Sequence, residues 1–464
     1  MIKNAIGSVF ANYKIQTISD DEFIKYKVNV HNKIVDLLNP NIKVEKGTYI
    51  KGNISSKDNM LKMRLISPRI SIKDNQLVNV NLRIDNKNPL YNTFFKVDSI
   101  NTSFYKVKNF RTLNTTINDT LYLKSKFEGG DKYKDAYNLS FYYTMDEMQN
   151  FIFGLQNSSL TYKDIPWQIS PNKNLNKIFY NTDNDSLSIQ DAGIYHQSEQ
   201  LSASGFSTAK NLDYNVSIDS LDLGHITPNF PEFQFDGLLN GKLNLKQIGN
   251  DILPTAQLHI NHFKVNDEVL GDLVLKINTL KGNNAFVDMK VVKDKLQVLK
   301  ANGFVDMNKK SPFINGSILL QEFPTDILQN IFKDMFSNIR GNMTGNVQVK
   351  GNADNLSYDG KLYLNGFGLK VDVLNVDYQF DNRTVLYLHD QTFELKKAVF
   401  KDVMTKTKGE ISGIIKHRNF DKWYLDLDFD TDNLLVLDTP VNPDEPFYGK
   451  AFVGGKTRIH GYTN

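Results

Sequence analysis

The sequence predicts an all-β protein that is built from repeated sets of antiparallel strands. Segments such as "KLNLK", "NVQVK" and "YLDLDFD" alternate apolar and polar residues, as expected for strands with one buried and one solvated face. The composition is rich in Phe and Tyr, which favours strands over helices. Glycine-containing motifs also recur at long, nearly even intervals, which indicates an internal repeat.

Two independent series of glycines mark the repeat. The first is Gly237, Gly341 and Gly449, which are 104 and 108 residues apart, and a second glycine follows each within six residues (Gly241, Gly345 and Gly455). The second is Gly205, Gly303 and Gly413, with spacings of 98 and 110 residues. We therefore expect a first segment at 1–51 with an apolar crossover and the first glycine anchor, degenerate repeats at 52–236, repeats at 237–340 and 341–448, and the start of another at 449–464.

Each repeat is expected to contain several short strands, with Asn-Gly, Gly-Asn and Asp-Asn pairs as turns. Two amphipathic helices are expected between sets of strands. One begins at Thr325 and ends at Gly341, with Ile327, Leu328, Ile331, Phe332, Met335 and Phe336 at helical spacing. The other has a capping box from Thr144 to Glu147, followed by Met148, Phe151, Ile152 and Leu155. The proline-containing segments 226–237 and 438–449 are expected to be loops.

Charge and composition narrow the class of function. The 55 basic and 52 acidic residues nearly balance, so a nucleic-acid partner is not expected. Cysteine is absent, which excludes disulfides and thiolate chemistry. The first residues lack the apolar run of a signal peptide, and no stretch of about 18 apolar residues occurs. Because the chain stops inside a glycine motif, we expect it to be an internal piece of a longer protein.

Strands with one apolar face must cover that face. A two-sheet sandwich, a closed solenoid and a sheet curled into an apolar trough would each do so, and periodicity alone leaves all three open. About 25 to 35 strands stacked at roughly 4.8 Å would make a rod on the order of 120–170 Å long. An open apolar interior of that length would need an apolar, chain-like ligand.

The glycine segments "FDGLLNG", "IRGNMTG" and "FYGKAFVGG", the stretch "TKGEISGIIKHRNFDKWYLDLDFDTDNLLVLDT" and the crossover before each anchor carry a family likeness. On these residues the chain resembles the TamB family of translocation and assembly module subunits, within the AsmA-like group and closest to the form found in Bacteroidota. The likeness is clearest from Gly205 to Asn464.

The resemblance implies a β-taco, which is an elongated, curled, antiparallel-rich sheet with an apolar groove and short crossover helices. It implies a periplasmic protein, anchored in the inner membrane in its full-length form, that moves phospholipid between the inner and outer membranes. It also implies partners: phospholipid acyl chains, membranes at both ends, and an outer-membrane protein of the BamA family, similar to TamA, met through regions outside this chain. A structural or chaperone scaffold for outer-membrane protein insertion is the alternative.

Eight residues are the expected groove lining, because they alternate with polar neighbours in four strand segments. They are Leu243, Leu245, Leu258, Ile260, Val347, Val349, Leu362 and Leu364. The same residues could instead fill the core of a closed sandwich. Gly205, Gly237, Gly303, Gly341, Gly413 and Gly449 are expected to be structural anchors.

No residue pattern predicts catalysis, a cofactor or a metal site. Asp426, Asp428, Asp430 and Asp432 alternate with apolar residues, so a half-solvated strand explains them better than a calcium loop. His259 and His262 are three apart, which on a strand points them to opposite faces. "NGFG" at 365–368 fits a turn rather than a nucleotide site. A β-helix enzyme acting on polysaccharide would need a carboxylate cluster and short repeats, and neither is visible.

Overall fold

The computed structural model describes residues 4, 14, 16 and 22–462, except 89–91, 103–104, 131, 133, 149, 170–175, 182, 228–232, 250, 280–282, 308–310, 334, 353–354, 419–420 and 442–447. Within these residues nearly every element is a strand, and the assigned strand pairs are antiparallel. The all-β, antiparallel prediction is therefore confirmed. The chain divides into two compact units, Met1–Leu221 and Asp222–Asn464.

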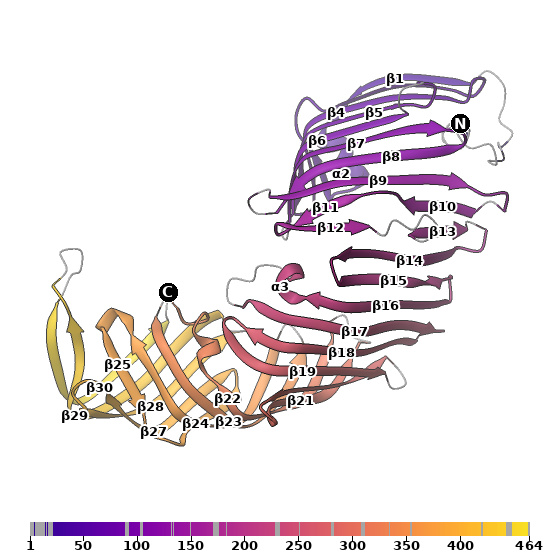
Figure 1. The fold of residues 1–464 in the computed structure, drawn as a ribbon. Helices are drawn as coiled ribbons and strands as arrows, with labels where there is room; N and C mark the ends of the chain where they lie inside the picture. Colours follow the sequence, from indigo (N-terminus) through magenta and orange to yellow (C-terminus); the bar gives the residue numbers. More distant parts are fainter. Residues whose placement is uncertain are drawn as a thin grey trace. The chain divides into compact units, whose positions relative to one another are not determined.

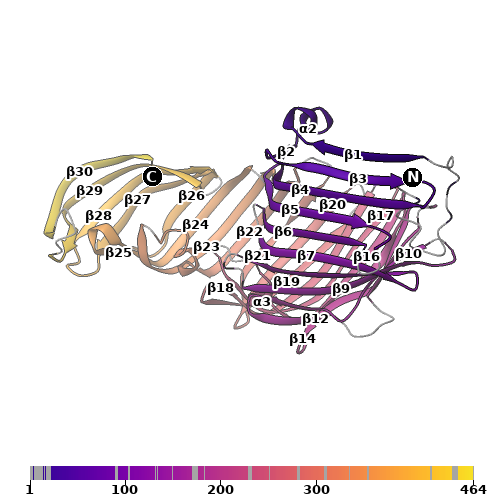
Figure 2. The ribbon, with the colours of Figure 1, turned by 90° about the horizontal axis from the view of Figure 1, so that it is seen from above.

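The first unit is a bent sheet in which strands mostly pair in chain order, as Figure 2 shows for β3 to β7. Between β9 and β14 the sheet is split, because β10 and β13 cover one half of its width and β11 and β12 cover the other. The elements are β1 Phe23–Asn29, α2 Asn32–Leu38, β2 Ile42–Val44, β3 Tyr49–Ser55, β4 Met60–Ile72, β5 Asn75–Asp85, β6 Thr93–Asn101, β7 Lys106–Ile117, β8 Thr120–Gly129, β9 Asp135–Met145, β10 Asn150–Leu155, β11 Ser159–Tyr162, β12 Ile165–Ile169, β13 Lys177–Asn181, β14 Ser186–His196, β15 Glu199–Ser207 and β16 Asn211–Asp222.

The second unit is a sheet of longer strands that also pair in chain order, except where β25 and β26 share β24 and β27. Figure 1 shows these strands bending along their length. The elements are α3 Leu223–Ile226, β17 Phe235–Ile248, β18 Asp251–Val265, β19 Glu268–Thr279, β20 Asn284–Lys293, β21 Leu296–Asp306, β22 Phe313–Pro324, the 3₁₀ turn η1 Asp326–Leu328, β23 Phe336–Asn352, β24 Asn355–Val371, η2 Asp372–Leu374, β25 Val376–Phe380, β26 Thr384–Asp390, β27 Thr392–Asp402, β28 Lys408–Arg418, β29 Asp421–Thr439 and β30 Gly449–Tyr462.

The connection before β23 is not the helix that the sequence predicts. Only the single turn η1 forms, and Phe336 already begins β23. Thr325 does not cap a helix; its hydroxyl instead donates to the Gly341 carbonyl at 3.0 Å. The apolar residues at helical spacing do not form one face of a helix. Ile327 packs into the core of the sheet, and Phe336 is the first residue of a strand.

The second predicted helix is also wrong, because residues 144–155 form the β9–β10 hairpin. Met145 pairs with Phe151 and Tyr143 with Phe153 across this hairpin. The Asp146 carboxylate accepts hydrogen bonds from the backbone N–H groups of Met148 and Asn150, which closes the turn. Hydrogen bonds from the backbone to the Asp146 side chain thus favour a hairpin turn here, although the capping-box pattern predicts a helix. Short helices do occur at other crossovers, as α2 and α3.

The Asn-Gly pairs do not mark turns. Asn240–Gly241, Asn302–Gly303 and Asn315–Gly316 lie inside β17, β21 and β22. The turn predicted for "NGFG" at 365–368 is likewise wrong, because these residues lie inside β24. The strands are accordingly longer than the short ones expected. Of the two predicted proline loops, residues 228–232 and 442–447 lie outside the described part of the chain.

Gly341 shows why a glycine is needed near the start of β23. The pairing with β24 shifts register between Arg340 and Asn342, and Gly341 lies in this β-bulge with φ +105°. A Cβ atom there would lie 2.6 Å from the backbone of Gly366. Gly237 lies in the equivalent irregularity near the start of β17, and Gly449 is the first residue of β30. The other anchors, Gly205, Gly303 and Gly413, lie within β15, β21 and β28.

Candidate functional site: the inner face of the second unit

One face of the second unit is apolar along rows that cross every strand from β17 to β30 except β25. Directly paired residues of antiparallel strands point to the same side, so the register defines these rows. The first row is Leu239, Ile260, Leu273, Val291, Leu299, Leu320, Gly345, Leu362, Leu386, Leu395, Gly413, Leu427 and Ile459. The second row is Gly241, Leu258, Leu275, Met289, Ala301, Ile318, Val347, Gly360, Leu388, Phe393, Ile415, Leu425 and Gly461. We call the side that carries both rows the inner face.

All eight residues predicted to line a groove lie on the inner face. Leu258 and Val347 belong to the second row, Ile260 and Leu362 to the first. Leu243, Val349 and Leu364 lie two residues beyond a row member of the same strand, and Leu245 lies four residues beyond Gly241. Their exposure differs: Val347, Val349, Leu362 and Leu364 are buried, Leu243, Leu258 and Ile260 are half-buried, and Leu245 is 40% exposed. The register brings the eight together on one side, and their contact with a ligand remains a proposal.

The burial of the middle of the inner face requires the sheet to bend. A flat single sheet leaves both faces in water, yet Val347 and Leu362 are only 6% and 7% exposed. These side chains belong to one cluster that joins Val265 in β18 to Leu388 in β26. A second cluster joins Val376 in β25 to Leu435 in β29, and the Tyr378 hydroxyl donates to the Leu435 carbonyl at 2.9 Å. The sheet therefore folds over its own apolar side.

The β22–β23 connection crosses the inner face. Phe336 pairs with Val371 at one edge of the sheet, whereas Trp423 lies two residues before inner-face Leu425, near the opposite edge. Phe332, in the connection next to Phe336, nevertheless has its ring 5.4 Å from that of Trp423. Residues 325–333 therefore pass over apolar side chains that they help to cover.

Trp423 belongs to an aromatic cluster around a buried histidine. The His417 ring lies 5.1 Å from the rings of both Phe393 and Trp423, and 6.2 Å from that of Tyr358. Burial lowers the pKa of His417, and the charge of Asp390 partly opposes this. The imidazole is therefore held in its neutral form on the apolar side of the sheet.

A buried carboxylate organises the loop after β27. Asp402 is fully buried and accepts hydrogen bonds from the backbone and hydroxyl groups of Thr405 and Thr407. Burial opposes its ionisation, but these hydrogen bonds outweigh burial and lower the pKa of Asp402. Burial also raises the pKa of neighbouring Tyr378 to about 12. Both groups serve the loop and the fold, because their hydrogen bonds are made within the chain.

Three of the alternating aspartates, Asp426, Asp428 and Asp430, lie on the outer side of β29, and Asp432 lies in a register shift between Thr431 and Leu434. Asp428 and Asp430 face Arg458 and Lys456 of β30, and the Arg458 guanidinium binds the Asp426 carboxylate through two bonds of 2.8 and 2.9 Å. His259 pairs with Val274 on that outer side, whereas His262 lies in a bulge with φ +52°. Within the described residues, no group of three or more His, Cys, Asp or Glu side chains could hold a metal ion.

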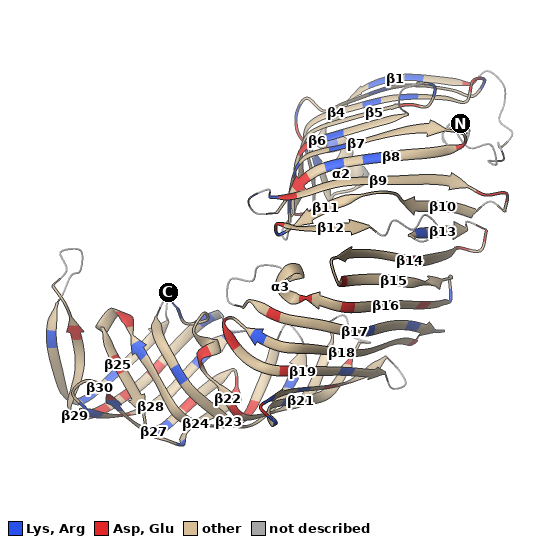
Figure 3. Cartoon of the chain, in the orientation of Figure 1, with Lys and Arg blue, Asp and Glu red and all other residues tan. Residues whose placement is uncertain are grey.

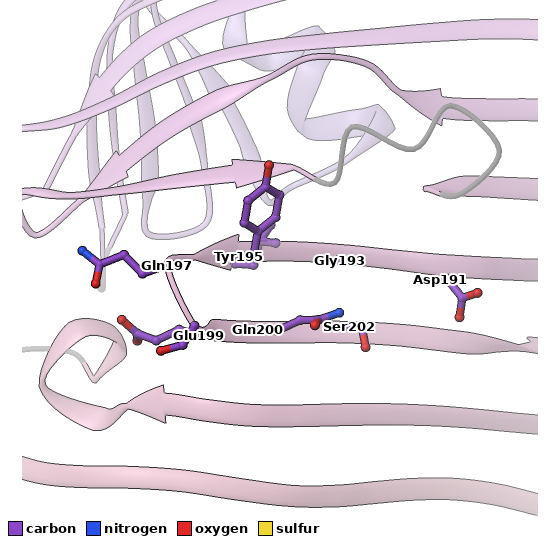
Figure 4. Close-up of a pocket in the computed structure, with 9 residues that line it drawn as sticks. Asp191, Gly193, Tyr195, Gln197, Glu199, Gln200 and Ser202 are labelled. Carbon is purple, nitrogen blue, oxygen red and sulfur yellow. The ribbon is translucent and has the colours of Figure 1, made fainter.

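The first unit contains a ladder of aromatic rings beside a buried carboxylate. Phe95, Phe110, Phe127 and Tyr137 form a ladder of rings with centroids 4.4–5.7 Å apart. Next to it, the Tyr105 hydroxyl donates to buried Asp135 at 2.7 Å, and burial raises the pKa of Tyr105. A shallow hollow lies along β14 and β15, and Figure 4 shows its residues spread along both strands rather than converging on one point. It offers no constellation for chemistry.

The apolar rows were predictable from sequence, but the cluster around His417 was not. Its members come from β24, β27, β28, β29 and a connection, so only the fold brings them together. The repeated aromatic residues in "HRNFDKW" at 417–423 are the local signal that could have indicated it.

An antiparallel sheet bent over its apolar side defines a β-groove type of protein. The family model described as TamB, N-terminal domain, matches residues 136–364. This match, over just under half of the chain, supports a TamB-type protein; the TamB family is one of transport and assembly modules. Neither the curated proteins nor the solved structures gave a match. In the described residues, no helix has both the length and the apolar character to cross a membrane.

Proposed function

We propose that the chain is a lipid-conducting segment of an envelope protein, in which phospholipid acyl chains lie along the inner face while headgroups stay at the solvated rim. The continuous apolar register from β17 to β30 supports this proposal. Neither register row contains a charged side chain, so an acyl chain would meet no desolvation barrier along them. Movement would be passive and would need no covalent step.

The bent sheet also supports a role in bridging membranes as part of a longer, periplasmic chain. Such a chain would be anchored in the inner membrane and would reach an outer-membrane protein of the BamA family, similar to TamA. The alternative is a scaffold for outer-membrane protein insertion that pairs its edge strand with unfolded strands.

Photocrosslinking separates these functions. A photoreactive residue at inner-face Leu245, which is 40% exposed, should capture phospholipid from native membranes, and mass spectrometry would identify the adduct. The matched control is Lys246, the next residue and on the outer side. We expect lipid adducts at Leu245 at least tenfold more often than at Lys246. Equal labelling, or labelling by protein strands only, would contradict lipid conduction.

A transport assay tests the same idea in the buried middle of the face. Replacing Val347 and Leu364 together by Asp or Arg places charge among buried apolar side chains. We expect lipid flux to fall by at least tenfold. Normal flux in a double variant that remains folded by circular dichroism would refute the groove.

A further inference from the structure

The outer side of the first unit carries a stripe of basic residues, one on each of seven successive neighbouring strands. The stripe begins with Lys27, Lys51, Arg64 and Arg83, which face one another directly across β1, β3, β4 and β5. It then steps by two residues to Lys96, Arg111 and Lys126, which face one another across β6, β7 and β8. Figure 3 shows basic segments on β1 and β8, at the two ends of this stripe. We call these seven residues the basic stripe.

The charges of the basic stripe are largely unneutralised. Lys96 binds Asp98 at 2.9 Å, and this hydrogen bond is the main cause of the lowered pKa of Asp98. The charge of Arg111 also contributes to the lowered pKa of Asp98, but among the described residues no acidic side chain lies within ion-pair distance of any member other than Lys96. The Nε atom of Arg64 is buried without a hydrogen-bond partner. A half-buried guanidinium between Lys51 and Arg83 therefore lacks both a counter-charge and a full set of hydrogen bonds.

This arrangement opposes stability, because like charges directly opposite each other on neighbouring strands repel. The same chain places opposite charges in register elsewhere: Asp428 and Asp430 of β29 face Arg458 and Lys456 of β30. A sheet that can alternate charges in one place but aligns seven cations in another departs from the pattern that favours folding. Such departures are expected at functional sites.

We propose that the basic stripe binds a linear polyanion, and specifically an acidic polysaccharide that lies across the strands. Seven strands at roughly 4.8 Å spacing give a stripe about 29 Å long and one side chain wide. A polymer with a carboxylate on each sugar ring presents charges in a line with a comparable repeat. A bilayer would match a broad basic face better than a single line of charges.

This inference concerns the outer side of the first unit and does not rest on lipid conduction. If the proposal holds, the protein attaches to an anionic polymer through the outer side of its first unit, which is separate from the apolar rows of the second unit. Binding should be strongly salt-dependent, because each cation that meets the polymer releases condensed counterions. It should also need an oligomer long enough to reach several strands.

The test uses the whole chain and fluorescent oligomers of polygalacturonate in an anisotropy titration at low salt. The variant is Lys51→Glu with Arg83→Glu, which alternates charge along the stripe and should fold at least as well as the natural chain. We expect its affinity to fall by at least tenfold and its salt dependence to weaken. The control is Lys290→Glu with Lys300→Glu, a facing pair of lysines on β20 and β21 with the same change in net charge, and it should bind within twofold of the natural chain.

Three results would overturn the proposal. One is the absence of polygalacturonate binding by the natural chain, with neutral dextran as the baseline. Another is an equal loss of affinity in the stripe variant and the control, which would indicate net charge alone. The third is tighter binding to phosphatidylglycerol vesicles or to single-stranded DNA than to polygalacturonate, which would assign the stripe to a membrane or a nucleic acid.

Discussion

At the scale of single residues, Gly413 shows how close the strands approach on the inner face. Gly413 adopts φ +134°, and a Cβ atom there would lie 2.1 Å from the Asp426 carbonyl oxygen on β29. Gly413→Ala should therefore lower the free energy of unfolding by about 2–3 kcal/mol. Denaturant unfolding followed by Trp423 fluorescence would measure this loss.

Gly455 is the matched control for Gly413, because it has φ +112° but no heavy atom within 4 Å of an added Cβ. Gly455→Ala should cost only the backbone strain, about 1–2 kcal/mol. An equal loss in both variants would show that the approach of the Asp426 carbonyl does not matter.

His417 predicts a pH dependence of the second unit. Its pKa in the folded protein is lowered by burial from the ordinary value of 6.5, so protonation favours the unfolded chain. The stabilisation is complete above pH 6.5 and is lost as the pH falls below it toward the folded pKa. His417→Phe should abolish this component of the pH dependence. Thermal unfolding between pH 7.5 and 5 would compare the two proteins, and identical slopes would contradict the assignment.

At the scale of elements, the β22–β23 connection shows what a sequence pattern can and cannot predict. The spacing of its apolar residues predicts that they are buried on one side, and Ile327 does lie in the core. Their helical spacing was misleading, because Thr325 binds Gly341 and Phe332 packs on Trp423, and both partners are distant in sequence. The alternation of apolar and polar residues along a strand can be predicted from the sequence, because it reflects which side of that strand is buried. The course of a connection cannot, because it depends on contacts with residues that are distant in the sequence.

The connection also carries a prediction about local stability. Phe332→Ala removes the half-buried ring that contacts Trp423, so residues 325–335 should open more often. We expect faster amide hydrogen exchange there, at least tenfold at Phe332 and Met335, whose backbone N–H groups donate to the Leu328 and Phe332 carbonyls. Exchange in β17 to β20 should be unchanged. A uniform increase across the second unit would mean that the ring supports the whole sheet instead.

At the scale of the whole molecule, alternation is the rule that orders both units. It placed the eight predicted residues on one side of the second unit, because the pairs that these residues make lie between the β-bulges and keep the parity that the sequence shows. It could not indicate the basic stripe, whose members are scattered between residues 27 and 126 and meet only through register. Sequence thus predicts which side a residue faces, and pairing decides its neighbours across the sheet.

Paired substitutions test this rule in each unit. Leu362 is 7% exposed on the inner face, whereas the next residue, Tyr363, is 38% exposed on the outer side. Leu362→Asp should lower the free energy of unfolding by more than about 3 kcal/mol, and Tyr363→Asp by about 1 kcal/mol or less. In the first unit, Ile54→Asp places a carboxylate where the natural side chain is only 5% exposed, so it should be as costly as Leu362→Asp. Asn53→Asp instead places a carboxylate between two lysines, Lys25 and Lys62, which face residue 53 from the neighbouring strands. Asn53→Asp should therefore be neutral or stabilising.

The two tryptophans report on the two units separately, since Trp167 lies in the first and Trp423 in the second. Because the chain divides into two compact units, each inner-face charge should lower the transition of its own unit most. Leu362→Asp should shift the Trp423 transition, and Ile54→Asp the Trp167 transition, measured with single-tryptophan variants. If inner and outer substitutions within a pair cost the same, parity does not define the buried side. If every substitution shifts both transitions equally, the two units unfold as one cooperative body, and the effect of a substitution on stability is not confined to its own unit.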